Sequence, residues 1–141
     1  MKKFLLCIFI LLIMISNSFA AQKREAADVD LTKLNSMMTY STLFNIMLHP
    51  DEYLGKTIKI KGVFDSAKDP DTGIDYFAVV IMDDTMCCSS GLDFSLKKAY
   101  KYEYPKDYPE IGSNITVMGK LEKYTEGENI FYHLAEADIV K

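Results

Sequence analysis

Two adjacent cysteines, Cys87 and Cys88, are the residues of this 141-residue chain whose type and spacing point most directly to chemistry. The third cysteine, Cys7, lies in a segment that we expect to be removed, so neither has a distant cysteine partner. Neighbouring Cα atoms lie about 3.8 Å apart, less than the usual disulfide span, so a bond between the pair would be strained. Thiolates also bind soft metals such as zinc and Cu(I). The pair predicts a strained disulfide, a thiol metal site or two packed thiols.

A metal site would need further ligands, because structural zinc takes four and catalytic zinc takes three from the protein. The chain has two histidines, His49 and His133, and the carboxylate of Asp93 follows the cysteines closely. If the last strand passes near the segment after the second strand, His133 can approach Asp93 and the two thiols. We therefore predict a zinc or copper site made of Cys87, Cys88, Asp93 and His133. His49 is the alternative to His133 as the nitrogen donor. A surface or helix-capping role is the alternative for each histidine.

A second candidate site is a run of tyrosines and lysines between residues 97 and 108. Tyr100, Tyr102 and Tyr104 recur at every second position, and lysines flank them. Aromatic faces beside cations can stack on bases or sugars. The same spacing suits one face of an extended segment that packs on the protein, and we favour this packing role.

The N-terminus predicts export. Lys2 and Lys3 precede an apolar run over residues 4–15, and small side chains at Ser18 and Ala20 fit cleavage after Ala20. A membrane-spanning helix needs about 20 apolar residues, and this run is shorter. We predict a signal peptide over residues 1–20, a periplasmic or extracellular location, and no membrane span after cleavage.

The remaining chain predicts one acidic domain. Residues 21–35 are polar and are expected to form a flexible leader, and residues 36–141 to form the domain. The formal net charge of the chain is −4, and loss of the signal lysines makes it more negative. Because nucleic acid binding depends on neutralising phosphates, we expect no nucleic acid partner.

One helix and five strands follow from the apolar periodicity. Apolar residues at helical spacing from Tyr40 to Met47 predict a helix that Ser41 or Thr42 can cap and Pro50 ends. Alternating or β-rich segments then predict strands over 57–63, 76–82, 91–96, 114–124 and 130–134. Glycines inside the first and fourth segments predict bends. We predict a mainly β fold, a five-stranded OB-like barrel preceded by an N-terminal α-helix, with a flat meander as the alternative.

Two motifs carry a resemblance to known proteins. The frame Pro50-x-x-Tyr53-x-Gly55-Lys56-x-Ile58-x-Ile60-x-Gly62, with Ile115-x-Val117-x-Gly119-x-Leu121 further on, resembles the first and fourth strands of bacterial OB-fold proteins. The segment Cys87-Cys88-x-x-Gly91-Leu92-Asp93-Phe94 resembles a narrower group of uncharacterised exported or membrane-associated bacterial proteins with an OB-like domain. The resemblance covers about residues 43–140 and implies an OB fold and export. The chain departs from nucleic-acid-binding OB folds in lacking a basic aromatic face on the second and third strands.

Together these features predict an exported, non-catalytic binding module that holds a thiophilic metal or switches redox state through its vicinal cysteines. No serine-nucleophile motif, phosphate loop or zinc-protease motif occurs in the sequence. The alternative is a module that binds another envelope protein or a glycan, with purely structural cysteines.

Overall fold

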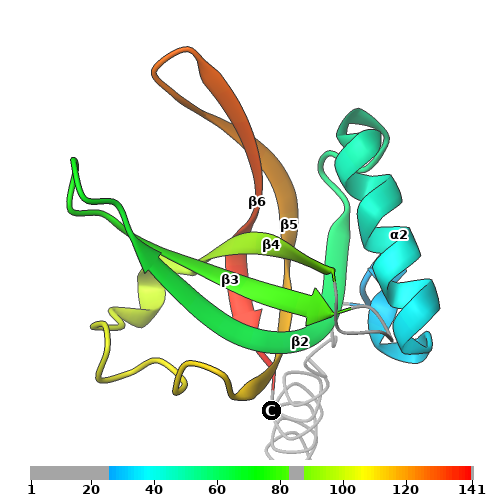
Figure 1. The fold of residues 1–141 in the computed structure, drawn as a ribbon, viewed down its shortest axis with the longest axis horizontal. Coiled ribbons are helices and arrows are strands. Elements are labelled where there is room, and N and C mark those ends of the chain that lie inside the picture. Colours follow the sequence, from blue (N-terminus) through cyan, green and yellow to red (C-terminus); the bar gives the residue numbers. More distant parts are fainter. Residues whose placement is uncertain (1–25, 83–87, 141) are drawn as a thin grey trace, which may run out of the picture.

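The computed structural model describes residues 26–82 and 88–140, which form a mainly β fold with one α-helix (Figure 1). The elements are β1 (Val29–Asp30), the 3₁₀-helix η2 (Leu31–Lys33), α2 (Ser36–Leu48), η3 (Pro50–Glu52), β2 (Thr57–Lys68), β3 (Asp75–Met82), β4 (Ser89–Leu96), η4 (Lys98–Tyr100), β5 (Asn114–Glu126) and β6 (Asn129–Ile139). The predicted helix and all five predicted strands are confirmed, and each strand extends beyond its predicted range. Within these residues, no helix is both long and apolar enough to cross a membrane.

The five long strands close into a ring. Antiparallel pairs join β2 to β3, β3 to β4, and β6 to β5, whereas β4 and β6 are parallel. The ring closes because β2 also pairs with β5 through residues 57–63, before it pairs with β3 through residues 63–68. β1 adds a short parallel strand beside β2. The sheet therefore curls on itself and is not a flat meander.

Gly62 lies where β2 changes partner. A Cβ atom added there would lie 2.4 Å from the carbonyl oxygen of Val80, so only glycine allows β2 and β3 to approach so closely. Gly119 in β5 is similarly confined, 3.0 Å from atoms of Leu134 and Ala137, at a register shift between β5 and β6. Both glycines lie where the curled sheet is most crowded, as the predicted bends required.

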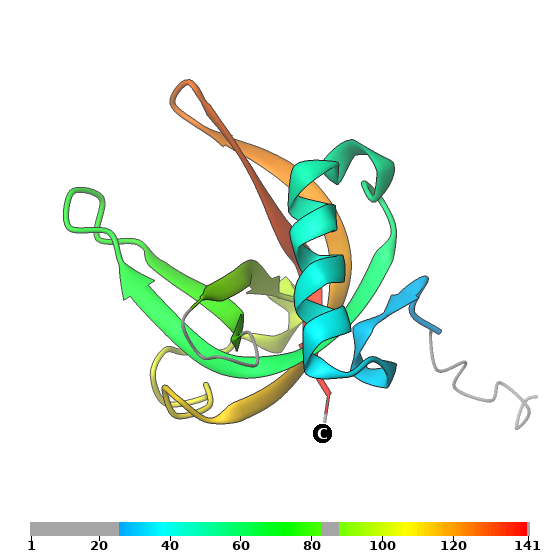
Figure 2. The ribbon, with the colours of Figure 1, turned by 45° about the vertical axis from the view of Figure 1, so that its right-hand side comes forward.

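α2 lies across the end of the ring at which β3 ends and β4 begins (Figures 1 and 2). Its Leu43 and Ile46 are fully buried in the same core as the strands, whereas Phe44 is 50% exposed. The helix begins earlier than predicted, because Asn35 supplies the cap: its side-chain oxygen accepts from the Met38 amide at 2.9 Å. The helix therefore closes one end of the ring with apolar side chains.

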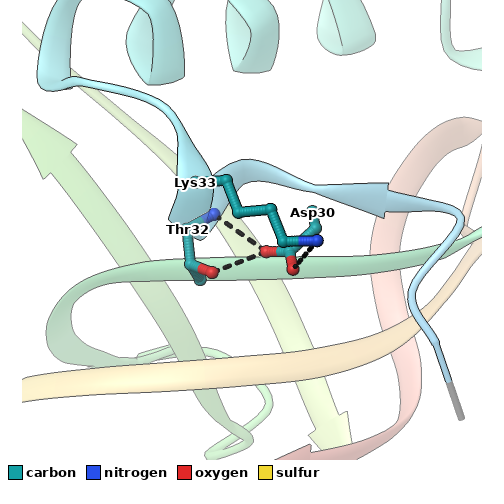
Figure 3. A network of polar contacts seen from close by, with 3 residues as sticks. All are labelled: Asp30, Thr32 and Lys33. Carbon is teal, nitrogen blue, oxygen red and sulfur yellow. Dashed lines mark hydrogen bonds and ion pairs between the residues drawn. The ribbon is translucent and has the colours of Figure 1, made fainter.

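The fold also begins before the predicted end of the leader. β1 pairs with β2, and Leu31, which is 2% exposed, belongs to the core. Figure 3 shows the contacts that fix this segment: the Asp30 carboxylate accepts from the amide (3.1 Å) and hydroxyl (2.6 Å) of Thr32, and lies 3.3 Å from the Lys33 ammonium. These bonds cap η2 and leave Leu31 facing inward. The predicted leader over 21–35 therefore contains folded residues from Val29 onward, which its polar composition concealed.

Candidate ligand-binding groove

The β2–β3 and β5–β6 hairpins project from the ring on the side away from α2 (Figure 1). A groove lies between them, lined by residues from the start of β3, the end of β4 and the end of β5. Its volume is about 370 Å³, which lies in the range of about 300–1,000 Å³ that is usual for small-molecule sites. Side chains from β3, β4, β5, β6 and two connections, the one before β3 and the one between β4 and β5, line it. The aromatic ones are Tyr76, Phe77, Phe94, Tyr108 and Tyr124, and the charged or titratable ones are Asp75, Asp93, Lys98, His133 and Glu136.

The aromatic side of the groove is continuous with the core. The Phe77 ring stacks on Tyr108 with centroids 4.2 Å apart, and its centroid lies 6.1 Å from that of the fully buried Phe64. On the other hairpin, the Tyr124 ring lies 4.7 Å from the ring of His133. Packed rings keep few rotamers, so the groove presents flat faces in fixed positions. Burial also raises the pKa of Tyr108 and of Tyr124, so both hydroxyls stay neutral near pH 7.

Asp93 and His133 are neighbours across the parallel pair of β4 and β6. Burial raises the pKa of the Asp93 carboxyl, although the imidazole of His133 acts in the opposite direction. Burial lowers the pKa of His133, although the carboxylates of Glu122 and Asp93 oppose this shift. The imidazole is therefore neutral at pH 7, with one nitrogen that donates and one that accepts. The pair offers hydrogen-bonding groups of both kinds at the floor of the groove.

Tyr76 joins the two hairpins that flank the groove. Its hydroxyl donates to the carboxylate of Glu126 at 2.6 Å, which links the start of β3 to the end of β5. The hydrogen bond to Glu126 is the main reason that the pKa of Tyr76 is raised to about 12. This bond fixes the separation of the hairpins and hence the width of the groove.

Glu136 enters the groove from a bulge in β6. The register between β5 and β6 shifts between Met118 and Lys120, and opposite this shift Glu136 adopts a φ of 48°. A left-handed backbone is uncommon for a residue that carries a Cβ, and it persists where the surrounding structure requires it. The bulge places the Glu136 side chain in the lining of the groove.

The predicted metal ligands are brought together only in part. Asp93 and His133 are neighbours, as the hypothesis required. Cys88 is exposed and lies just before β4, five residues before Asp93, which at about 3.3 Å per residue of extended chain separates them by roughly 16 Å. Cys87 lies outside the described residues. Within residues 26–82 and 88–140, no three His, Cys, Asp or Glu side chains are grouped so that they could hold a metal ion.

The zinc, copper or redox hypothesis for Cys87 and Cys88 stays a prediction. Its other nitrogen donor, His49, is exposed at the end of α2, where the alternative capping role would place it. Thiol titration with and without reductant, together with metal analysis of the purified protein, tests the hypothesis directly.

The predicted tyrosine run packs against the ring and still presents surface to solvent. The Tyr104 ring lies 5.1 Å from that of Phe77, and its hydroxyl shares a 2.9 Å hydrogen bond with Ser66. The Tyr100 hydroxyl donates to Asp138 at 2.7 Å. The exposed fractions of the three side chains are nevertheless 45%, 47% and 36% for Tyr100, Tyr102 and Tyr104.

Three groove residues, Tyr76, Tyr124 and Glu136, were not singled out from the sequence. Tyr76 begins one of the predicted strands and Tyr124 ends another, so an aromatic residue at a strand end was the available signal. Glu136 had no comparable signal, because its place depends on a bulge that only the pairing of β5 and β6 reveals.

Comparisons with known proteins give little to set beside this geometry. No family model matches the chain, and no curated protein matches it. Among solved structures, the chain is similar to a candidate nucleic acid-binding lipoprotein from Klebsiella pneumoniae subsp. pneumoniae. The two are 25% identical, the match covers 70% of this chain and 85% of that one, and the TM-score is 0.47. A similarity this weak assigns neither a fold nor a function to this chain.

Proposed function

We propose that this chain is an exported, non-catalytic binding module built on an OB-like barrel, and that it binds an oligosaccharide in the groove. The order of the ring supports the OB-like assignment, because β2, β3, β4, β6 and β5 follow one another around it and β4 and β6 are parallel. Small five-stranded Greek-key barrels of this kind bind oligosaccharides or oligonucleotides beside their hairpin loops.

The observation that carries the proposal is that flat aromatic faces and hydrogen-bonding groups share one groove. A sugar ring has a face of C–H bonds and a rim of hydroxyls that both donate and accept. Tyr108 and Tyr124 supply aromatic faces against which such a ring can pack. Asp93 and His133 supply the acceptors and the donor that its hydroxyls need.

The charge of the groove favours a sugar over a nucleic acid. Asp75, Asp93 and Glu136 line it, and Lys98 is the cation among its lining residues. An oligonucleotide would bring phosphates toward these carboxylates in a chain whose net charge is −4. Sugar hydroxyls meet no such repulsion and can donate hydrogen bonds to the carboxylates.

The proposal has two further parts: the protein binds its ligand without converting it, and the protein is exported. Asp93 and His133 are the groove groups best placed to move protons, and we assign them to hydrogen bonding with the ligand. The apolar run over residues 4–15 and the small residues that follow it support export.

Calorimetric titration of the purified protein with gluco-, manno-, galacto- and chito-oligosaccharides tests the proposal, with a thymidine oligonucleotide as the competing class. We expect at least one sugar to bind, to be recovered intact, and to bind about tenfold more weakly to Tyr124→Ala, which removes a stacking face. The control variant Phe44→Ala removes an exposed aromatic side chain from α2 and should leave binding unchanged. Binding of the oligonucleotide alone, or sugar binding that is indifferent to Tyr124→Ala, would overturn the proposal.

A further inference from the structure

A second, smaller hollow of about 140 Å³ lies beside the groove and is basic. Lys97, Lys98 and Lys101 line it together with Leu96, Tyr102 and Tyr108. Leu96, Lys98 and Tyr108 line the groove as well, so these three side chains form the wall between the two hollows. A ligand that extends past this wall passes from carboxylates and aromatic rings to ammonium groups.

Two of the lysines in the basic hollow carry charge that no ion pair offsets. Lys97 pairs with Asp138, which also accepts from the Tyr100 hydroxyl. Over the two described stretches of chain, neither Lys98 nor Lys101 takes part in an ion pair. Two such ammonium groups at one hollow create a local positive potential on a protein whose net charge is −4.

The backbone at this hollow is as unusual as the backbone at the groove. Lys101 follows η4 in a left-handed conformation with a φ of 41°. Among the non-glycine residues that the structure describes, Lys101 and Glu136 are the two with positive φ, and one lines each hollow. Such conformations are retained where the fold fixes a side chain in a required direction.

From this juxtaposition we propose that the oligosaccharide is acidic, with a sugar ring in the groove and a uronate carboxylate in the basic hollow against Lys98 and Lys101. This inference rests on the proposed function, because the groove must hold the sugar before the hollow can select its charge. Lysine suits the role, since its compact ammonium attracts an anion without demanding one planar geometry.

The test compares pairs of ligands that differ only in charge. Trimers that carry one terminal galacturonic, mannuronic or glucuronic acid beside two neutral sugars are each titrated against the protein beside their methyl esters, which keep the rings and lose the charge. We expect at least one acid to bind about tenfold more tightly than its ester at low salt, and the difference to shrink as salt screens the lysines. The double variant Lys98→Gln/Lys101→Gln should lower the affinity for the acid to that for the ester. Lys101→Gln alone, which changes a side chain of the hollow that does not line the groove, should weaken binding of the acid and leave the ester unaffected.

A matched control removes the same charge elsewhere. Lys59→Gln/Lys61→Gln changes two lysines of β2 that line neither hollow, and it should preserve the preference for the acid. Equal binding of acid and ester, or a preference that survives Lys98→Gln/Lys101→Gln, would overturn this inference while the groove remains a sugar site. If no acid, no ester and no neutral sugar binds, both this inference and the proposed function are wrong.

Discussion

The two ends of the five-stranded ring are built from different side chains. At one end, α2 contains no charged residue and buries Leu43 and Ile46 in the core. At the other end, the groove gathers half-buried aromatic and titratable groups such as Asp93, His133 and Tyr124. Apolar burial stabilises a fold most, whereas half-buried polar groups are the ones that can bind a ligand. Substitutions at the two ends should therefore separate stability from binding.

The largest effect is expected from Leu43→Ala at the α2 end. The side chain is fully buried, so truncation leaves a cavity and should lower the free energy of unfolding by about 3 kcal/mol. Its neighbour Phe44 is half exposed, and Phe44→Ala should have a much smaller effect. Urea denaturation followed by circular dichroism measures both. Equal losses for the two variants would mean that α2 does not close the ring in the way described.

Gly62→Ala should lower the free energy of unfolding by about 2 kcal/mol, because its new Cβ would lie 2.4 Å from the Val80 carbonyl oxygen. The comparison is Gly127→Ala at the tip of the β5–β6 hairpin, where no atom lies within 4 Å but φ is 59°. For Gly127→Ala, backbone strain alone should lower the free energy of unfolding by the smaller amount, about 1 kcal/mol. The same denaturation measurement ranks the two, and the reverse order would contradict the close approach of β2 and β3.

The pH dependence of stability should reveal the groove pair through two opposite trends. Because burial lowers the pKa of folded His133, its contribution is complete above about pH 6.5 and is lost as the pH falls through the lowered pKa. Because burial raises the pKa of folded Asp93, its contribution is complete below the ordinary value of 3.8 and is lost as the pH rises through the raised pKa.

Two variants separate these trends in denaturation experiments between pH 3 and pH 8, a range of about five units that spans both ordinary values. His133→Gln should remove the loss of stability on acidification, and Asp93→Asn should remove the loss on going from acid toward neutral pH. Variants with the parent's pH dependence would show that neither group is buried in the groove as described.

The smallest effect is expected from Tyr76→Phe, which removes the hydrogen bond between the two hairpins. The hairpins would keep their strands but lose their fixed separation, so sugar affinity should fall about threefold. Calorimetric titration measures the change, and Glu126→Gln is the control because its amide oxygen still accepts the bond. A larger loss for Glu126→Gln than for Tyr76→Phe would mean that the charge of Glu126 matters more than the bridge.

The sequence predicted the strands well because their period of two is a local property. It also marked Gly62 and Gly119, since a glycine inside an alternating segment signals a close approach. It placed the start of the fold too late, because the anchoring residue of the first segment is a single apolar side chain, Leu31, in a polar stretch. The strands and the two glycines could be predicted from neighbouring residues, whereas the start of the fold could be placed only once the closed ring was known.

The candidate site was harder to predict, because it joins residues that are distant in the chain. Asp93 and His133 were paired only by assuming that the last strand passes near the segment after the second strand, and the parallel pairing of β4 and β6 makes the two residues neighbours. The cysteine pair drew attention because of its chemistry, yet Cys88 immediately precedes β4, the strand whose far half lines the groove. Tyr124 offered only its place at the end of a predicted strand, and Glu136 carried no local signal, since its place in the groove exists only after β5 and β6 have paired.

The most direct test of the account is a nitrogen-15 correlation NMR titration of the labelled protein with the tightest-binding oligosaccharide. We predict that the amide shifts cluster at the start of β3, the end of β4 and around His133 in β6, with none along α2. Shifts that concentrate on α2 or beside Cys88, or a spectrum unchanged by every sugar tested, would contradict the assignment of the groove as the binding site.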